Sequence, residues 1–414
     1  MIKDILHSVF IIVQIFALFY GFYYFSISIY GILERLNKKP IRNYLPLKKF
    51  AIFIPAHNEE KVIGNIVDNL KYLNYPKDCY DVFVIADNCS DNTAEIAKKG
   101  GANVLIRKDM DNKGKGFALK WAFREVLYKE EADYDAVVVF DADNLVSRNF
   151  LKEMNNKLCE GYKVLQGYID SKNPEDSWIT CSYSIAFWSA NRLFQCAREY
   201  LGLSCQIGGT GFCVDTNVLK KIGWGATCLV EDLEFTMRLM LNGIRVNWAH
   251  NAVVYDEKPL TLAQSWRQRR RWMQGFADVC SRYFIKTTTK AIREKDWALL
   301  DCALYTLQPY MIIMGGLILL IPFFNHFIYD GDMFIIINLF PEFFKVFGML
   351  QFLLIPISLL IDGKFSYKLF LYYPTYALYC LTWIPISIQG VIMKNNKEWS
   401  HTIHTRTLSI HELE

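Results

Sequence analysis

The stretch AVVVFDAD, Ala136–Asp143, carries the two features that decide how this chain folds. Its first five residues are apolar, a pattern typical of a short strand that is buried on both faces of a sheet. Two aspartates, Asp141 and Asp143, follow the apolar run. Because ligands of an open α/β sheet bind beyond the carboxyl ends of its strands, the stretch predicts a central strand with an acidic pair at the ligand-binding edge.

Similar apolar runs recur on both sides of this stretch, and the segments between them have the spacing of amphipathic helices. The runs are FAIFIPAH at 50–57, YDVFVIAD at 80–87, NVLIRK at 103–108 and KVLQGYID at 163–170. Alternating strands and helices predict βαβ units, so the expected fold is a Rossmann-like α/β domain with a mostly parallel sheet.

Polar residues follow the first two runs, where those strands should end. The first run ends in Pro-Ala-His, which includes Ala56, and Asn58 and Glu59 follow it, whereas Asp87 opens the cluster DNCSDNT at 87–93. Asn and Asp also form turns and cap helices, and that alternative applies to Asp91 and Asn92. Together with the acidic pair, these clusters predict one polar pocket at the sheet edge.

The acidic pair needs a positive partner, because two neighbouring carboxylates repel each other. A hard divalent cation with oxygen ligands supplies that charge, and it usually recruits a substrate phosphate. A simple turn is the alternative. Asp141 and Asp143 are therefore candidate metal ligands.

Two glycine-containing turns are candidate contacts for a ligand. Lys113 begins the sequence KGKG at 113–116, which opens a helix in the way that suits an anion or the edge of a nucleotide. Gly209, Thr210 and Gly211 belong to the loop GGTG, whose spacing does not match a dinucleotide fingerprint. We assign this loop to the acceptor side of the site.

Glu231 and Asp232 begin a helical segment that ends at Gly243. Acidic residues in a first helical turn complement the helix dipole, and this role suits Glu231. Asp232 could instead act as a catalytic base, provided that it faces the pocket.

The stretch SWRQRRRWMQGF at 265–276 contains four arginines and two tryptophans. On a helix, Gln268, Arg271 and Trp272 share one face, where a guanidinium suits a diphosphate and an indole suits a sugar ring. The other arginines, Arg267, Arg269 and Arg270, are expected to meet lipid headgroups or acidic loops.

Both ends of the chain are apolar. The uncharged run at 7–33 is long enough to cross a bilayer, which needs roughly 20 residues, and we favour a retained helix over a signal peptide. The basic residues after it are Arg35, Lys38, Lys39, Arg42, Lys48 and Lys49. By the positive-inside rule, the N-terminus lies outside and the following domain is cytoplasmic.

Three apolar segments near the other end, 297–327, 333–360 and 367–393, are each long enough to span. Three crossings would leave the tail outside, whereas Lys394, Lys397 and Arg406 favour the inside. We expect the segment at 333–360 to be the irregular one, because Pro341, Glu342 and Lys345 interrupt it. The predicted organisation is an N-terminal transmembrane helix at 1–39, a catalytic domain at 40–257, interface helices at 258–296, a transmembrane region at 297–393 and a tail at 394–414.

Composition excludes little beyond this. The eleven cysteines form no Cys-x-x-Cys pair, and this pattern predicts reduced thiols. A formal net charge of +4 with one arginine cluster does not favour a nucleic-acid partner.

The ordered motifs IPAHNE, ADNCSDNT, NKGKG, DAD, GGTG, ED and QRRRW resemble the membrane-embedded family 2 glycosyltransferases, which include cellulose, chitin, hyaluronan and poly-N-acetylglucosamine synthases. The resemblance runs from Phe50 to Trp272. It implies a GT-A domain of α/β class, cytoplasmic and embedded between transmembrane and interfacial helices. It also implies a UDP-sugar donor, Mg²⁺ or Mn²⁺ as cofactor, and a multi-pass location in the cell membrane.

The resemblance assigns roles residue by residue. The positions implied to line the nucleotide are Ala56, Asn58, Glu59, Asp87 and Lys113. The D-x-D positions Asp141 and Asp143 would hold the metal on the diphosphate. Asp232, beside Glu231, matches the general base that activates the acceptor hydroxyl. Gln268, Arg271 and Trp272 match Q-x-x-R-W, with Arg271 near the leaving diphosphate and Trp272 stacked on the acceptor.

One position departs from the family pattern: Val230 stands where several synthases have Thr. The tail sequence WSHTIHTR at 399–406 loosely resembles the loop that covers the nucleotide in these synthases.

Three functions remain as alternatives. The first is a processive, inverting synthase that elongates and translocates a β-linked polysaccharide, with UDP-N-acetylglucosamine slightly favoured over UDP-glucose as donor. The second is transfer of a single sugar to a membrane lipid, as ceramide glucosyltransferases perform. The third is a nonenzymatic membrane receptor or scaffold. The expected partners are the UDP-sugar, a growing glycan or lipid acceptor, membrane lipids and accessory subunits for export, with no nucleic acid.

Overall fold

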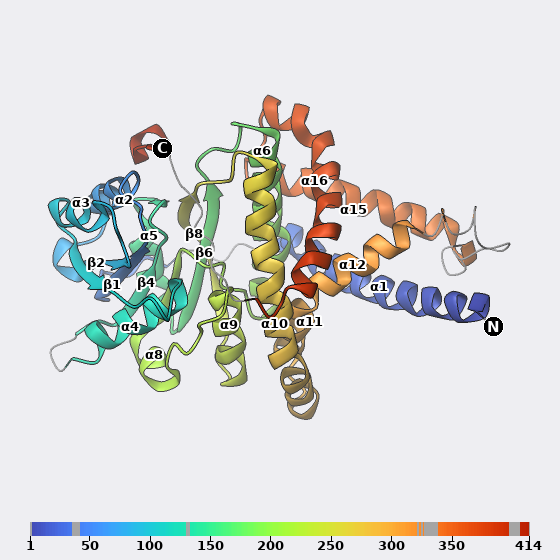
Figure 1. Ribbon diagram of the computed structural model, residues 1–414, viewed down its shortest axis with the longest axis horizontal. Helices are drawn as coiled ribbons and strands as arrows, with labels where there is room; N and C mark the ends of the chain where they lie inside the picture. The colour runs from blue at the N-terminus through green and yellow to red at the C-terminus, as the bar shows by residue number, and fades with distance from the viewer. Residues whose placement is uncertain are drawn as a thin grey trace.

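The computed structural model describes residues 2–34, 42–129, 133–320, 323, 326, 338–396 and 406–413, with side chains from Ser8 onward. Figure 1 shows a sheet domain on one side, and the helices α1 (Ile2–Leu33), α12 (Gln308–Leu319) and α15 (Pro341–Ile361) projecting from it on the other. Between these parts, α6 (Trp178–Ala190), α10 (Leu262–Glu294) and α16 (Tyr367–Ile392) lie alongside one another.

The domain is built on one eight-stranded sheet with the order β3-β2-β1-β4-β7-β6-β8-β5. The strands are β1 (Phe50–Ala56), β2 (Tyr80–Asp87), β3 (Asn103–Arg107), β4 (Ala136–Val139), β5 (Leu145–Val146), β6 (Val164–Ser171), β7 (Phe212–Asp215) and β8 (Val246–Asp256). All five strands expected from the sequence are present as β1, β2, β3, β4 and β6. The predicted α/β class with a mostly parallel sheet is confirmed.

Parallel pairing joins β3, β2, β1 and β4, and also joins β6 to β8. Strand β7 is antiparallel to both β4 and β6, and β5 is antiparallel to β8. The reversal at β7 matters for the site, because the residues before β7 lie at the same edge as the residues after β4.

Helices cover both faces of the sheet, since its central strands are apolar on both sides. One face packs against α4 (Lys115–Leu127), α6, α8 (Thr216–Ile222) and α9 (Glu231–Leu241). The other face packs against α2 (Ile63–Asn69), α3 (Thr93–Lys99) and α5 (Phe150–Cys159). The central strand β4 is fully buried between these layers, as its sequence predicts.

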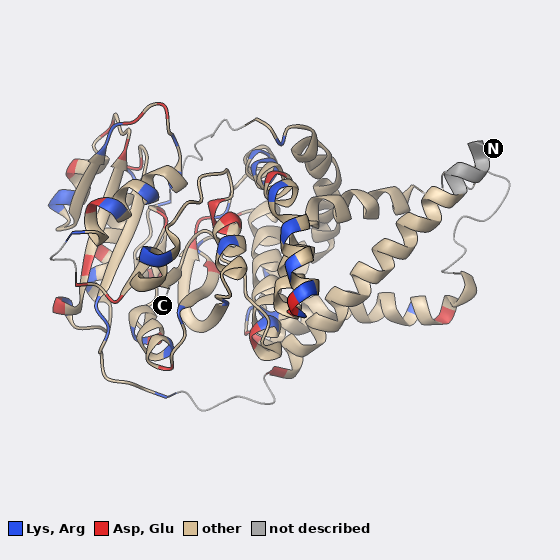
Figure 2. Cartoon of the chain, turned by 90° about the horizontal axis from the view of Figure 1, so that it is seen from below, with Lys and Arg blue, Asp and Glu red and all other residues tan. Residues whose placement is uncertain are grey.

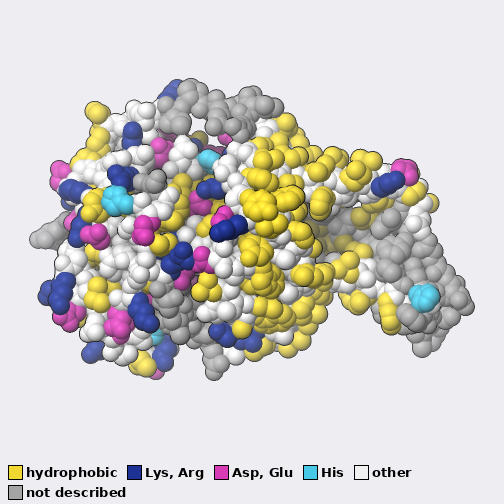
Figure 3. Space-filling model, turned by 90° about the horizontal axis from the view of Figure 1, so that it is seen from above, with side chains coloured by type: hydrophobic (Ala, Val, Ile, Leu, Met, Phe, Trp, Pro, Cys, Tyr) yellow, Lys and Arg dark blue, Asp and Glu magenta, His cyan; other side chains and the backbone are white. Residues whose placement is uncertain are grey.

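Within the described residues, α1, α15 and α16 are long and apolar enough to cross a membrane. Charged side chains concentrate on the sheet domain and its neighbouring helices, and few are present on the projecting helices (Figure 2). On the face shown in Figure 3, hydrophobic side chains form a broad continuous area beside the charged domain. A continuous apolar area of this kind is typical of a surface that contacts a membrane or a protein.

The segment expected to be irregular, 333–360, is described from residue 338 onward. Residues 338–339 are helical, Phe340 is a bend, and α15 begins at Pro341, so a helix boundary lies at the proline that interrupts the apolar run in the sequence. A second break, which the sequence did not indicate, lies between α11 (Trp297–Thr306) and α12, which bend by 61° at Leu307. Pro309 near the start of α12 lacks the amide that a continuous helix would use.

Arg192 joins the projecting helices to the domain. It lies in a π-helical segment, Asn191–Cys196, that continues α6 into α7 (Ala197–Leu201). Its Nη1 donates to Glu34 at the end of α1 at 2.9 Å, and its Nε donates to Asp362 after α15 at 2.8 Å. The domain-side ends of α1 and α15 are therefore held by one guanidinium.

Candidate active site

One cavity of about 960 Å³ lies between the sheet edge and helices α6, α9, α10 and α16. The carboxyl ends of β1, β2 and β4 open into it. Because β7 runs antiparallel to β4, with Val139 opposite Phe212, the loop before β7 also reaches this edge. Sheet topology thus brings motifs that are far apart in sequence into one site.

The two aspartates after β4 occupy different environments. The Asp141 side chain keeps 37% of its exposure, whereas Asp143 is buried. The Asp141 amide donates to Thr210 Oγ1 at 3.2 Å, and Asp143 Oδ2 accepts from the Glu257 amide at 3.3 Å. These contacts hold the Asp141 backbone beside Thr210 and the Asp143 carboxylate at the end of β8, and both residues line the cavity.

The carboxylate oxygens of Asp141 and Asp143 suit a hard cation that takes its remaining ligands from the substrate. Both side chains offer only oxygen, the ligand that Mg²⁺ prefers, and Mg²⁺ is usually held by one or two carboxylates plus substrate phosphates. Among the described residues, no group of three or more His, Cys, Asp or Glu side chains could hold a metal alone. Asp141 and Asp143 would hold the metal, and a donor diphosphate would complete its ligands.

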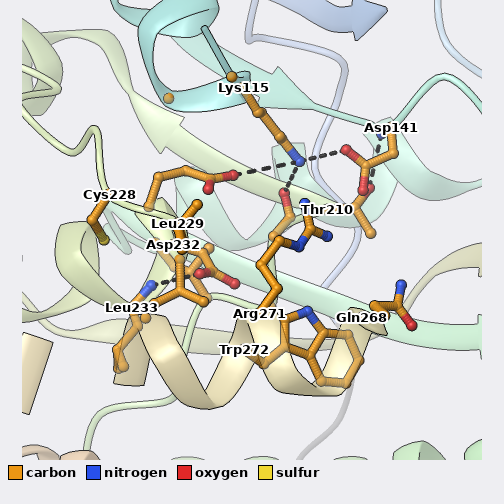
Figure 4. A pocket seen from close by; sticks show the side chains of 18 of the residues that line it. Lys115, Asp141, Thr210, Cys228, Leu229, Asp232, Leu233, Gln268, Arg271 and Trp272 are labelled. Atoms are coloured by element: carbon orange, nitrogen blue, oxygen red, sulfur yellow. Dashed lines mark hydrogen bonds and ion pairs between the residues drawn. The ribbon is translucent and has the colours of Figure 1, made fainter. Parts of the chain in front are cut away.

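Lys115 is the central cation of the cavity, and the sequence interpretation did not assign it. Its Nζ donates to an Asp141 carboxylate oxygen and, at 2.7 Å, to the Gly209 carbonyl, and it lies 4.0 Å from Glu231 Oε1 (Figure 4). Burial opposes its charge, but the Asp141 and Glu231 carboxylates outweigh burial and raise the pKa of Lys115.

Gly116 allows this arrangement. A Cβ at Gly116 would lie 2.6 Å from the Ala226 carbonyl oxygen and 3.2 Å from Glu231 Cβ. Only glycine permits so close an approach of α4 to the segment before α9. The glycine that follows Lys115 was therefore the feature of the sequence that indicated a close contact at this position.

The first turn of α9 carries the acid pair. Burial raises the pKa of Glu231 to about 7, and it also raises the pKa of Asp232. Both carboxylates line the cavity, and the Leu233 amide donates to Asp232 Oδ1 at 2.8 Å. A proton acceptor of raised pKa, held by a backbone amide, has the properties required of a general base. Glu234, in the same turn, pairs with Arg282 of α10.

The nucleotide-side predictions are only partly gathered in the cavity. Ala56, Glu59, Asp87 and Lys113 line it. Asn58 is not among the lining residues; its Oδ1 accepts from the Ser90 amide at 2.8 Å and holds the 88–90 turn. Its φ of 55° lies in the left-handed region, where Asn is tolerated.

Asp87 has an internal partner that the sequence did not indicate. Arg107 Nη1, at the end of β3, donates to Asp87 Oδ1 at 2.6 Å, and its Nη2 donates to Asp109 at 2.7 Å. Burial raises the pKa of Asp87, and Arg107 partly offsets that effect. Asp91 has the structural role left open above, because its carboxylate accepts the amides of Glu60 and Thr93.

The GGTG loop divides into a lining part and a packing part. Gly209 and Thr210 line the cavity, and a Cβ at Gly209 would approach Asp232 Oδ2 to 3.4 Å. Gly211 is not among the lining residues, and a Cβ there would lie 2.5 Å from Val254 Cγ1. Gly211 is therefore required by packing within the sheet.

The face of α10 follows the predicted helical spacing. Gln268, Arg271 and Trp272 all line the cavity, and Figure 4 shows Arg271 extending toward Asp141 and Thr210. Gln268 Oε1 accepts from Tyr183 Oη at 3.0 Å. Trp272 stacks on Trp383 of α16, with centroids 6.4 Å apart. The sequence did not reveal that α16 supplies part of this wall.

Arg269 corrects one prediction. It is fully buried, with Cζ 4.2 Å from the Tyr379 ring centroid and 4.8 Å from that of Trp383. Its Nη1 donates to Thr382 Oγ1 at 2.9 Å. Arg269 therefore packs behind the aromatic wall and does not face headgroups, whereas Arg267 is exposed.

The tail returns to the sheet domain. The Arg406 amide donates to Glu257 Oε2 at 3.3 Å, and its guanidinium pairs with Asp176. Ile410 is buried, and the His411 ring contacts Tyr72. Of the expected covering loop at 399–406, all but Arg406 lies outside the described residues.

Comparison with known proteins gives the class. Residues 46–275, more than half of the chain, match the family described as "Glycosyltransferase like family 2". The chain belongs to glycosyltransferase family 2, as its ordered motifs indicate.

Two curated relatives are informative. A probable glycosyltransferase, YdaM of Bacillus subtilis, is 29% identical over 255 residues, which is 59% of each chain. A poly-beta-1,6-N-acetyl-D-glucosamine synthase of Staphylococcus aureus is 28% identical over 282 residues, which is 66% of each chain. The match thus spans less than two thirds of either relative.

A solved structure shares the fold. The mannosyltransferase PcManGT from Pyrobaculum calidifontis, in complex with GDP-Man and Mn²⁺, has a TM-score of 0.61 and 17% identity. The alignment covers 94% of this chain and 99% of that one. The similarity therefore includes the flanking helices as well as the sheet, and it supports the GT-A assignment.

Proposed function

We propose that the protein is an inverting, processive β-glycosyltransferase that extends a glycan at the membrane from a UDP-sugar. The observation that carries the proposal is the shared cavity, in which Asp141, Asp232 and Trp272 come from three separate elements. A diphosphate-binding carboxylate, a candidate base and an aromatic platform are the three parts that sugar transfer requires.

The proposed reaction is a single displacement. Asp232 accepts the proton of the acceptor hydroxyl, whose oxygen attacks the anomeric carbon, while the bond from that carbon to the diphosphate oxygen breaks. The UDP leaves with the electron pair. Mg²⁺ or Mn²⁺, held by Asp141 and Asp143, would stabilise negative charge on the diphosphate. Arg271 supplies a further fixed positive charge at the same end.

Several features support a sugar chain as acceptor. Trp272, Trp383 and Tyr379 line one wall of the cavity, and Phe187 lies on the neighbouring helix α6. Flat aromatic faces suit sugar rings, and a series of them suits a chain. The named activity of the Staphylococcus aureus relative favours UDP-N-acetylglucosamine as donor over UDP-glucose.

We further propose that the sheet domain is cytoplasmic and that the protein is a multi-pass membrane protein. The basic residues after α1 and the apolar helices support this orientation. Accessory subunits for export would then act on the opposite side. The boundaries expected from sequence, with a catalytic domain at 40–257, belong to the same proposal.

The test is turnover with a panel of labelled sugar nucleotides and either metal, followed by sizing of the product. We expect a polymer formed from UDP-N-acetylglucosamine. A product that carries one sugar and extracts with lipid would contradict processivity, and preference for GDP-mannose would contradict the donor assignment.

The base is tested with Asp232→Asn, which keeps the shape of the side chain but cannot accept the proton. Transfer should fall by a factor of about 10² to 10⁴, with UDP binding retained. Asp68→Asn, at an exposed site on α2, is the matched control and should keep full activity. Residual transfer near the wild-type rate in Asp232→Asn would mean that another group is the base.

A further inference from the structure

Lys115 occupies the position between the proposed metal ligand and the acid pair. It begins α4, and its Nζ has three neighbours: an Asp141 carboxylate oxygen, the Gly209 carbonyl and the Glu231 carboxylate. Its side chain retains only 18% of its exposure, so solvent does little to weaken these interactions. The ammonium is the direct partner of Asp141 on the cavity side.

This contact conflicts with metal binding at the same oxygen. An ammonium that donates to Asp141 Oδ1 occupies one of the lone-pair positions of that carboxylate, and it repels a divalent ion bound at the others. The other neighbours of Lys115 give it a second place to go. Gly209 and Glu231 do not belong to the proposed metal site, and both remain within its reach.

We propose that Lys115 is a positioning residue that occupies Asp141 in the donor-free enzyme and withdraws onto the Gly209 carbonyl and Glu231 when the metal–diphosphate donor binds. The inference rests on the proposed function, since it needs the metal at Asp141. Lys115 thereby opposes binding of metal without donor. The donor overcomes this opposition because its diphosphate adds ligands and negative charge.

The movement also links the two halves of the site. Once released from Asp141, the ammonium lies against the acid pair of α9, where the acceptor is activated. Lys115 thus has one set of contacts without donor and another with donor, and the close approach at Gly116 keeps both within reach of one side chain.

The experiment measures binding of Mn²⁺ alone to the purified full-length protein, from the electron paramagnetic resonance signal of free Mn²⁺. Lys115→Met removes the charge and keeps the length of the side chain. We expect it to bind donor-free Mn²⁺ about tenfold more tightly than the wild type, as removal of a competing unit charge predicts. A purely structural role cannot produce tighter binding.

Lys120→Met is the matched control, because Lys120 lies exposed on the same helix. It should bind Mn²⁺ as the wild type does. Lys115→Arg keeps the charge and should retain weak donor-free binding, which provides a second variant if Lys115→Met folds poorly. Thermal melting of each variant checks folding.

Equal or weaker Mn²⁺ binding by a folded Lys115→Met variant would overturn the inference. Donor-free Mn²⁺ binding by Lys115→Arg as tight as that expected for Lys115→Met would also overturn it. Neither readout uses sugar transfer. Failure of the proposed function would appear separately, as absence of turnover with every sugar nucleotide in the panel.

Discussion

Arg192 Nε lies 2.8 Å from Asp362 Oδ1, and this contact joins the π-helical segment after α6 to the turn between α15 and α16. Both side chains are nearly buried. The same guanidinium holds Glu34 at the end of α1. Asn191 and Gln195 from the same segment line the cavity, so one short element contacts both the site and the projecting helices.

Arg192→Gln should therefore be strongly destabilising. It leaves Asp362 buried without its cation, and removal of one partner of a buried pair costs about 3–5 kcal/mol. Thermal melting of the detergent-purified protein measures the loss. Lys368→Gln breaks the exposed pair with Glu175 and should change stability by about 0–1 kcal/mol. Equal melting temperatures for the two variants would show that Arg192 does not hold the helices to the domain.

The acid pair of α9 predicts the pH dependence of transfer. Burial raises the pKa of Glu231 to about 7 and raises that of Asp232. Because the base must be ionised, kcat/KM should rise with pH, and this rising part of the pH profile should lie above the usual pKa range of an aspartate. Glu231→Gln removes a neighbouring negative charge, so it should lower the pKa of Asp232 and move the rising part of the kcat/KM profile to lower pH. If that part of the profile stays in place or moves to higher pH, Glu231 does not influence the ionisation of Asp232.

The same pKa has a consequence for stability. The pKa of an unfolded glutamate is about 4.3, so the neutral Glu231 side chain stabilises the fold fully below that pH. This contribution is lost as the pH rises through about 7. The melting temperature of Glu231→Gln relative to the wild type should therefore increase between pH 4.5 and pH 8. A difference that is constant with pH would mean that Glu231 is not titrating in this range.

Arg269 packs against Tyr379 and Trp383, on the side of these rings that faces away from the cavity. Arg269→Met fills much of the same space but loses the cation–π contacts with Tyr379 and Trp383, which are worth about 2 kcal/mol when desolvated. Since Trp383 stacks on Trp272, we expect the KM for acceptor to rise about tenfold, with little change in the KM for donor. Arg267→Met, on the exposed side of α10, should leave both unchanged. A rise in the donor KM alone would contradict this assignment.

Local sequence patterns predicted the first half of the sheet, because β1 to β4 are apolar runs with helices between them. They did not predict β7, whose four residues, Phe212–Asp215, give too short a pattern. The antiparallel direction of β7 depends on its partners β4 and β6, and that information is nonlocal. For this reason the sequence could name the GGTG loop as a ligand contact but could not place it beside Asp141.

The candidate site shows the same limit. Helical spacing correctly grouped Gln268, Arg271 and Trp272, since three residues on one helix face need no tertiary information. Lys115 and Arg107 were missed, because their importance comes from the carboxylates they meet across the fold, at Asp141 and Asp87. Arg269 was assigned to the wrong environment because its partners lie more than a hundred residues later, on α16.

The position of the tail predicts its side of the membrane. Arg406 contacts Asp176 and Glu257 of the sheet domain, and His411 contacts Tyr72, so we expect the tail and the domain to lie on the same side. A cysteine introduced at the exposed Thr407 should therefore resist a membrane-impermeant thiol reagent in intact cells and react after permeabilisation. Ser8→Cys, exposed toward the other end of α1, should react in intact cells if the N-terminus is outside. The unsubstituted protein gives the background from its own cysteines, including the exposed Cys380. Reaction of Thr407→Cys in intact cells would place the tail outside. If the sheet domain is cytoplasmic, the contacts of Arg406 with it could then not form.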